Sequence, residues 1–462
     1  MLGQRLLILA DDWTGASDTA LAFFEHGLPT ALLALASEPS TSTPAPSPTL
    51  ATLQDDRVLS VTLNTRNLTP NEAYTTTQTW LAQYLDSMDA DWVYRKMDST
   101  LRGPFVADTL PLLQQGLKKA CLVLPAYPQS HRCTIGGYHL LQGQPLHRTE
   151  FVNDPQAPVL ESFIPELIKQ QLHQLDIAPE DPLATIGQVP LTIINKGAGA
   201  IMQHLRLLAQ QGCRWMVCDA ANTHDITQVA LAFTRCQHEL QLLPMGSAGF
   251  AHALADAWQQ EPQGDASTSN AKIVRPEKAP PLPITVISGS TTSTSQQQLA
   301  QLLATANKRS WRTHVLHPQP SMWYQPTLMT GHSREGALPP STELSIITSC
   351  LESHDKQLTL ELGQQHGFNS KQVARRIEQG LASMSATTVP QHHALVLCGG
   401  ATAQVVLQQL GIQQLRMVRR LLDNVALLQE PTTQRWVVLK SGNMGDASTL
   451  VELVSQLKHS MV

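Results

Sequence analysis

Charged residues and cysteines are both scarce in this chain. Asp, Glu, Lys and Arg make up 15% of its 462 residues, and the formal net charge is -5. Such a balance offers no basic surface for a nucleic acid or for an anionic membrane, so we expect neither among its partners. The seven cysteines are an odd number without the spacing of a zinc knuckle. We therefore expect reduced, mostly buried thiols and a cytoplasmic protein.

Long apolar segments are also missing. No run of apolar residues approaches the roughly 18 that a membrane-spanning helix needs. The first residues lead directly into a strand pattern and have neither the apolar core nor the cleavage site of a signal peptide. The composition is that of an ordinary globular protein, and the length predicts two or three domains with sizeable cores.

The chemistry begins with residues 6–20, LLILADDWTGASDTA. A short apolar run ends in two carboxylates, Asp11 and Asp12, and a small-residue turn then opens a helical pattern. This order is typical of a buried parallel strand that feeds a helix, and ligands bind beyond the carboxyl ends of such strands. A single Asp at this point is often only a helix cap. With two, one can cap the helix while the other faces the crevice.

Strand and helix patterns alternate along the next 240 residues. The predicted strands are 29–35, 57–63, 92–97, 120–124, 191–194 and 215–220, and the predicted helices include 72–88 and 226–238. Residues 37–49 and 129–158 have the composition of loops. The alternation predicts an α/β fold with a mostly parallel sheet flanked by helices.

A second domain of the same class is predicted after a linker. Residues 259–283 mix Pro, charge and small polar residues, which is typical of a linker between domains. We therefore expect an N-terminal domain over 1–258 and a C-terminal domain over 284–462. In the latter, strands 284–288, 394–398 and 436–440 each run into a turn rich in Gly, Ser or Thr, 373–384 is helical, and about 309–345 is irregular.

These three turns have the chemistry of a phosphate site. Glycine lets backbone amides approach an anion, and a helix that starts after the turn adds its positive end. Three such turns in one domain make it our candidate nucleotide-binding domain. The Walker A pattern and the HRD and DFG motifs of protein kinases are absent. No GxGxxG follows a strand with an acidic residue about 20 positions later, which argues against a nicotinamide-dependent oxidoreductase.

The N-terminal domain has the complementary groups. Cations and acids both lie at or near its strand ends, and they are Arg66, Lys96, Arg102, Asp11, Asp12 and Asp98. Cations suit a carboxylate or phosphate, and acids suit hydroxyls or accept a proton. A structural salt-bridge network is the alternative for each residue taken singly. His131, His139 and His147, with Glu150 and Asp154, fit no standard zinc spacing.

Eight segments together resemble a known family. They are ADDWTGASDTA (10–20), NTRN (64–67), KMDSTLRGP (96–104), PAYPQSHRCTIGGYHLLQGQPLHRTEFVNDP (125–155), GSAGFAHALA (246–255), SGSTTSTSQQQL (288–299), CGGATA (398–403) and LKSGNMG (439–445). In this content and order the chain closely resembles the four-carbon acid sugar kinases, a family that includes D-threonate, D-erythronate and 3-oxo-tetronate kinases.

The resemblance implies a sugar-acid-binding N-terminal domain, an ATP-binding C-terminal domain, and phosphoryl transfer to the 4-hydroxyl across the cleft between them with Mg²⁺. The implied substrate residues are Asp11, Asp12, Arg66, Lys96, Met97, Asp98, Ser99 and Arg102. The implied ATP residues are Ser288, Ser290, Gly399, Gly400, Ala401, Thr402, Gly442 and Gly445. Ala401 stands where the family commonly has Glu. The metal ligands stay undetermined.

The hypothesis for catalysis gives roles to Asp12, Asp98 and Lys96. Arg66 and Lys96 bind the acid, and Asp12, or else Asp98, accepts the hydroxyl proton. D-threonate is the preferred substrate, and D-erythronate and 3-oxo-tetronate are the alternatives. A non-catalytic sensor of sugar acid and nucleotide is the rival of another class. We carry a homodimer as a hypothesis for the oligomeric state.

Overall fold

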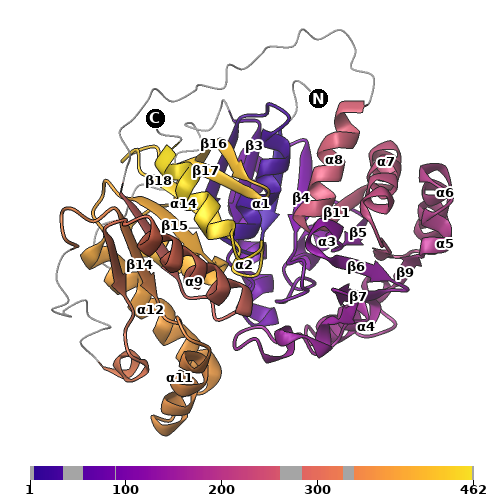
Figure 1. Ribbon diagram of the computed structural model, residues 1–462. Helices are drawn as coiled ribbons and strands as arrows, with labels where there is room; N and C mark the ends of the chain where they lie inside the picture. The colour runs from indigo at the N-terminus through magenta and orange to yellow at the C-terminus, as the bar shows by residue number, and fades with distance from the viewer. Residues whose placement is uncertain (1–4, 35–55, 89, 261–282, 326–337, 460–462) are drawn as a thin grey trace. The chain divides into compact units, whose positions relative to one another are not determined.

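The computed structural model describes residues 5–34, 56–88, 90–260, 283–325 and 338–459. The predicted loop at 37–49 and nearly all of the predicted linker at 259–283 lie outside these ranges. Tertiary contacts divide the chain into two compact units. The colours of Figure 1 follow the residue number, so the helices and strands of each unit can be found there. The first unit is 1–30 with 49–270, and the second is 31–48 with 271–462.

The first unit is built on a sheet whose described strands are all parallel. Its order is β3 (Val58–Thr62), β1 (Leu6–Ala10), β4 (Trp92–Lys96), β11 (Leu242–Gly246), β5 (Ala120–Leu124), β10 (Trp215–Cys218) and β9 (Ile186–Val189). Its helices are α1 (Trp13–Phe24), α2 (Pro70–Met88), α3 (Leu110–Gln114), α4 (Ile164–His173), α5 (Leu191–Ile194), α6 (Ala198–Gln210), α7 (Thr223–Leu240) and α8 (Ala248–Gln260). Helices cover both faces of a sheet of this kind, so its central strands are almost wholly buried and apolar.

Two predictions for this unit are wrong. Residues 191–194 form the short helix α5, and the strand lies just before them as β9. A four-residue apolar run has no periodicity that separates a strand from a helical turn. Residues 129–158 contain a small antiparallel sheet of β6 (Arg132–Ile135), β7 (Tyr138–Leu141) and β8 (Gln144–Pro145) with several 3₁₀ turns.

A glycine pair makes the tight turn of this small sheet. Gly136 and Gly137 join β6 to β7 with φ values of 61° and 80°, the left-handed conformation that a two-residue hairpin turn requires. Asp219, just after β10, accepts hydrogen bonds from both of their amides at 2.8 and 2.9 Å. The hairpin is therefore fixed to the parallel sheet by a buried carboxylate.

The second unit has a mixed sheet. Its order is β13 (Thr313–Leu316), β14 (Leu344–Thr348), β12 (Ile284–Ser288), β15 (Ala394–Cys398), β18 (Trp436–Lys440), β17 (Val425–Gln429), β16 (Gln414–Leu422) and β2 (Thr30–Ala34). The first five strands are parallel, and the other three pair antiparallel. Its helices include α9 (Ser293–Lys308), α11 (Ser353–Gln365), α12 (Ser370–Thr388), α13 (Gly400–Gln409) and α14 (Thr449–His459).

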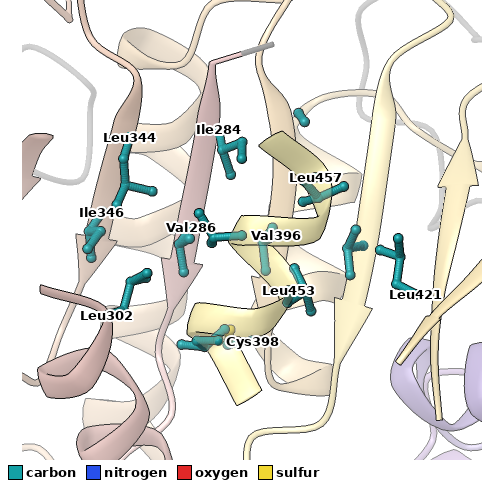
Figure 2. Close-up of a cluster of buried hydrophobic side chains, with 14 of the residues drawn as sticks. Ile284, Val286, Leu302, Leu344, Ile346, Val396, Cys398, Leu421, Leu453 and Leu457 are labelled. Atoms are coloured by element: carbon teal, nitrogen blue, oxygen red, sulfur yellow. The ribbon is translucent and has the colours of Figure 1, made fainter. Parts of the chain in front are cut away.

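The three strands predicted in this domain are confirmed with their bounds at 284–288, 394–398 and 436–440. The stretch from about 309 to 345 was expected to be irregular, yet it contains β13, the 3₁₀ helix at 320–324 and the start of β14. Figure 2 shows part of the core, in which side chains of β12, β14 and β15 gather with Leu453 and Leu457 of α14. The predicted fold class, α/β with mostly parallel sheets and flanking helices, is confirmed.

One strand of the second unit comes from the N-terminal part of the chain. β2 pairs antiparallel with β16, with Leu32 opposite Leu415. Residues 31–34 therefore group with the C-terminal unit, although they precede β3 of the first unit in sequence. The domain limits at 258 and 284 stay a prediction.

A buried ion pair lies beneath the carboxyl ends of β1 and β4. Arg95 in β4 is fully buried and forms an ion pair with Asp108. Arg95 also donates to the carbonyls of Leu9 and Lys96, both at 2.6 Å. Asp108 accepts a hydrogen bond from the Thr65 hydroxyl at 2.8 Å. The pair thus ties together the ends of β1 and β4 and the segment after β3.

We predict that Asp108→Ala opens this edge of the sheet. Removing one partner leaves a buried, unpaired charge on Arg95, which costs about 3–5 kcal/mol. Because two units can unfold separately, amide hydrogen exchange of the β1 and β4 peptides is the measurement. Their opening free energy should fall by that amount, whereas Glu239→Ala, which breaks an exposed pair with Arg206, should leave it unchanged. Equal protection in the two variants would contradict the role of the pair.

Candidate functional site

The acids and cations predicted in the N-terminal domain meet at one edge of its sheet. Asp11 and Asp12 follow β1, Arg66 comes shortly after β3, and Lys96 is the last residue of β4. β3, β1 and β4 are neighbours and run parallel, so their carboxyl ends lie side by side. Their contacts bring these groups together, and their role as a substrate site stays a prediction.

Arg66 is the centre of this cluster. Its Nε donates to Asp11 Oδ2 at 2.7 Å, its Nη1 donates to Asp12 Oδ2 at 2.5 Å, and Nη2 lies 3.8 Å from Asp98 Oδ1. Burial acts to lower the pKa of Arg66, but the three carboxylates raise it well above its ordinary value. Most of its donors are therefore already directed at carboxylates of the chain.

Asp12 begins helix α1 as its N-cap. Its Oδ1 accepts a hydrogen bond from the Gly15 amide at 2.7 Å, and its Oδ2 accepts one from the Thr14 hydroxyl at 2.8 Å. A Cβ on Gly15 would lie only 2.7 Å from Lys96 Nζ and 2.8 Å from Asp12 Oδ1. Glycine at this position is what lets the lysine and the cap approach one another.

Asp11 keeps an open oxygen. Its Oδ2 is bound to Arg66, whereas the buried Oδ1 has no hydrogen-bond partner among the described residues. Lys96 Nζ lies 3.9 Å from that oxygen and donates to the Met97 carbonyl at 2.6 Å. Burial acts to raise the pKa of Asp11, but Arg66 and Lys96 lower it overall. Asp11 is thus an ionised carboxylate with one acceptor to spare.

Asp98 is held within its own loop. Its Oδ2 accepts from Arg102 Nε at 2.6 Å and from the Thr100 hydroxyl at 2.5 Å. Burial acts to raise its pKa, but Arg102 and Arg66 hold it well below the usual range. Arg102 also lies 3.3 Å from Asp154. Met97 and Ser99, the other predicted residues of this loop, differ in exposure: Met97 is fully buried in the core, whereas Ser99 is half-buried.

Three further residues of this region were not predicted as site residues. Arg132 and His139 come from the small hairpin, and Asp18 comes from α1. His139 Nε2 lies 2.9 Å from the Ser99 carbonyl, and burial lowers the pKa of His139 to about 4, so the imidazole is neutral. Sequence spacing offered no sign of these contacts, because the hairpin was taken for a loop. The described residues contain no group of three His, Cys, Asp or Glu side chains arranged for a metal ion.

Asp18 has an unusual environment for a carboxyl group. Burial raises its pKa to about 7, Asp12 adds to the rise, and Lys96 and Arg132 oppose it. Its Oδ1 is buried and has no hydrogen-bond partner among the described residues. The carboxyl group therefore changes charge near neutral pH.

The three turns predicted in the C-terminal domain also come together. The Gly289 amide donates to the Thr402 hydroxyl at 3.1 Å, which joins the turns after β12 and β15. The hydroxyls of Thr292 and Ser295 donate to the Gly442 carbonyl at 3.2 and 2.7 Å, which joins the turns after β12 and β18. A Cβ on Gly442 would lie 2.5 Å from Ser290 Oγ, so this close packing requires glycine.

The turns carry groups suited to an anion. Ser288 Oγ is fully buried without a hydrogen-bond partner among the described residues. Gly399 caps α13 with φ 100° and has no side chain to occupy the first amides of the helix, and Gly400 and Ala401 are the first two helical residues. Lys440 at the end of β18 is buried, donates to the Ser441 carbonyl at 2.7 Å and forms no ion pair within the described ranges. Burial lowers the pKa of Lys440. A phosphate chain would satisfy these groups.

Both halves of the chain match family models. Residues 6–254 match a sugar-binding N-terminal domain, and residues 285–450 match a nucleotide-binding C-terminal domain. Over 459 residues the chain is 24% identical to a D-threonate kinase of Salmonella typhimurium, with 97% of both chains covered. It is also 24% identical to a D-erythronate kinase of Heliobacterium modesticaldum, with 98% of this chain and 97% of the relative covered. A 3-oxo-tetronate kinase of Pectobacterium atrosepticum is 26% identical, with 96% of both covered.

The chain belongs to the four-carbon acid sugar kinase family. Membership confirms the predicted enzyme class, a phosphotransferase with an alcohol group as acceptor. The acid–cation cluster lies in the part that matches the sugar-binding domain, and the three glycine turns lie in the part that matches the nucleotide-binding domain.

Solved structures show the same fold. A crystal structure from Salmonella typhimurium LT2, solved under a provisional description as a tRNA synthase, matches with a TM-score of 0.71 at 21% identity over 97% of this chain and 98% of that one. A Haemophilus influenzae protein matches with a TM-score of 0.61 at 20% identity over 98% and 100%. Within the described ranges of this family member, no helix has the length and apolar character to cross a membrane.

The Asp18 carboxyl group gives a prediction for the pH dependence of stability. Its pKa is about 7 in the folded protein against an ordinary 3.8, so the folded state binds the extra proton between these values. Stability therefore falls as pH rises from about 4 to about 7. The melting temperature of the wild type should drop more between pH 5 and pH 8 than that of Asp18→Asn, which cannot ionise. Parallel pH profiles for the two proteins would show that Asp18 titrates normally.

Proposed function

We propose that this protein phosphorylates the 4-hydroxyl of a four-carbon sugar acid with ATP, and that the acid is D-threonate. The observation that carries the proposal is the pairing of two clusters in one chain. One is an acid–cation cluster at the strand ends of the sugar-binding domain, and the other is a set of three joined glycine turns in the nucleotide-binding domain. Phosphoryl transfer needs such positioning and charge neutralisation more than covalent help.

The acid–cation cluster suits the hydroxyls of a sugar acid. Asp11 Oδ1 is an ionised acceptor without a partner among the described residues, and Asp12 Oδ1 accepts a single hydrogen bond there. Carboxylate oxygens with spare lone pairs accept hydrogen bonds from sugar hydroxyls. Lys96, whose ammonium has three donors and one hydrogen-bonded acceptor, supplies positive charge beside them.

The joined turns suit the phosphates of ATP. The free amides at the start of α13, the Ser288 hydroxyl and the Lys440 ammonium are the groups that we assign to the phosphate chain. The turn after β18 contains one carboxylate, Asp446, which is exposed and accepts hydrogen bonds from the Ser448 amide and hydroxyl, both at 2.8 Å. Ala401 stands where the family commonly has Glu. Because the Asp446 carboxylate is already bound by Ser448, the turns do not fit Mg²⁺, which prefers carboxylate and phosphate oxygens.

Attack on the γ-phosphate needs an acceptor for the hydroxyl proton. Asp12 is our assignment, because it lies at a helix N-terminus where a phosphoryl group is attracted. Its neighbour Asp11 is the alternative, because its Oδ1 has no partner among the described residues. Asp98 is less suited, since Arg102 and Thr100 bind its carboxylate. The meeting of acid and γ-phosphate in a cleft between the domains, the homodimer and the cytoplasmic location stay predictions.

A coupled assay of ADP release tests the function. With Mg-ATP, the panel is D-threonate, D-erythronate, L-threonate, L-erythronate and 3-oxo-tetronate, with a control that lacks acid. We expect turnover with D-threonate at a higher kcat/KM than with any other acid. Preference for another acid of the panel would correct the substrate. Binding of ATP and an acid without turnover would favour the sensor over the kinase.

The assignment of the proton acceptor predicts the effect of two isosteric variants. Asp12→Asn should lower kcat by about 10²–10⁴, the usual loss for a general base. Because Asn also caps helices well, the start of α1 should be kept, while loss of the charge paired with Arg66 should lower the melting temperature without unfolding the protein. Asp11→Asn is the matched comparison. A larger loss in Asp11→Asn than in Asp12→Asn would move the role to Asp11, and unchanged turnover in both would remove it from this pair.

A further inference from the structure

Among the residues that the structure describes, Arg132 is a buried cation without an acidic partner. It is the first residue of β6 and is 3% exposed. Its Nη1 donates to the Ser130 carbonyl at 2.6 Å. Its Nε is buried and has no hydrogen-bond partner, and the guanidinium forms no ion pair, within the described ranges. One long edge of the guanidinium, formed by Nε and Nη2, is therefore open.

The buried Arg95 and the partly buried Arg66 and Arg102 of the same unit all have acidic partners. Arg95 is paired with Asp108, Arg66 with Asp11 and Asp12. Arg102 is paired with Asp98 and Asp154. Burial of an unpaired charge is unfavourable, and proteins tolerate it where a partner arrives from outside. Burial lowers the pKa of Arg132, and Asp98 only partly offsets this.

The hairpin directs Arg132 towards the substrate cluster. Alternate residues of a strand lie on the same face, so Arg132 shares a face with Thr134. The Thr134 hydroxyl lies 2.9 Å from His139 Nδ1, and His139 Nε2 lies 2.9 Å from the Ser99 carbonyl. This face of the hairpin thus packs on the loop that carries Asp98. The titratable groups around Arg132 belong to the same region, and they are Asp98, Arg102, Tyr127, Asp18 and His139.

None of these groups neutralises Arg132 directly. Asp98 is bound to Arg102 and Thr100. Asp18 Oδ1 has no hydrogen-bond partner among the described residues, so it does not bind Arg132. His139 is neutral at physiological pH. The guanidinium of Arg132 is therefore free to pair with a negative charge that a ligand brings.

We propose that Arg132 binds the carboxylate of the sugar acid through its open Nε–Nη2 edge. The proposal rests on the proposed function and replaces Arg66 in the sequence-based assignment, because Arg66 is already bound to Asp11 and Asp12. Guanidinium and carboxylate match in plane and spacing, so the contact is bidentate. The acid end of the substrate then lies against Arg132, and its hydroxyls lie toward Asp11 and Asp12.

The assignment makes the carboxylate the feature that Arg132 selects. Threitol, in which a CH₂OH group replaces the carboxylate of threonate, keeps the other hydroxyls and has no charge. The wild type should strongly prefer D-threonate to D-threitol. In Arg132→Met that preference should collapse, because only the acid loses a partner. A purely structural role would impair both substrates alike.

The experiment compares Arg132→Met and Arg132→Lys with Arg206→Met, an exposed arginine paired with Glu239. KM for D-threonate should rise about 10-fold to 100-fold in Arg132→Met, the loss of a hydrogen-bonded charge contact. Arg132→Lys, which keeps the charge without the bidentate edge, should fall between. KM for ATP should stay within about twofold in all variants, and Arg206→Met should behave as wild type.

Each outcome has a distinct meaning. An unchanged KM for the acid and an unchanged acid-to-threitol ratio in both variants would overturn the role of Arg132 and leave the kinase intact. If the wild type neither turns over nor binds any acid of the panel, the proposed function itself fails. If Arg132→Met unfolds, Arg132→Lys decides, provided that its melting temperature matches that of Arg206→Met. A loss of acid-to-threitol preference in Arg132→Lys then supports the proposal, and a retained preference overturns it.

Discussion

Removal of charge from water at the ends of three parallel strands is the constraint on which the sugar-binding domain depends. β1 is followed by Asp11 and Asp12, β4 ends in Lys96, and Arg66 comes shortly after β3. A charge removed from water at these strand ends is costly unless it is paired. The ion pairs of Arg66 and of Arg95 with Asp108 neutralise these charges, and they join residues that follow or lie in different strands. The same contacts fix the register in which the carboxylates face the ligand. One set of ion pairs therefore stabilises this part of the fold and sets the geometry of the site. Asp11 Oδ1 and Arg132 Nε are unusual here because they have no partner among the described residues.

Each domain has a lysine at the end of a strand, and the two lysines differ in whether a carboxylate lies nearby. Lys96 ends β4 and donates to the next carbonyl, and Lys440 ends β18 and does the same. Lys96 lies within 4.0 Å of a carboxylate, Asp11, whereas Lys440 has no such neighbour among the described residues. A matched lysine suits a ligand of modest charge, such as a sugar acid. An unmatched one suits a ligand that brings several negative charges, as a nucleotide phosphate chain does.

Much of this arrangement could be predicted from sequence, and the reasons for the misses are physical. Short apolar runs closed by Pro, Gly or polar residues indicated the buried parallel strands at 120–124, 394–398 and 436–440. The clustering of Asp11, Asp12 and Arg66 followed from the topology. The run 191–194 was too short to distinguish a strand from a helix. Gly136 and Gly137 give the hairpin turn, but the polar sequence around them hid the strands. Arg132 and Asp18 could not be singled out, because burial and the absence of a partner are properties of the tertiary structure.

The assignment of β2 to the nucleotide-binding unit has a consequence for how this protein can be divided. The chain passes from one unit to the other after Thr30, returns near residue 49, and passes again near residue 270. A fragment that starts at 284 would lack β2 and would present the backbone of β16 as an open sheet edge, where chains associate and aggregate. The two halves are therefore not interchangeable modules. Any gene fusion, truncation or recombination of this chain has to carry the short N-terminal strand along with the C-terminal half.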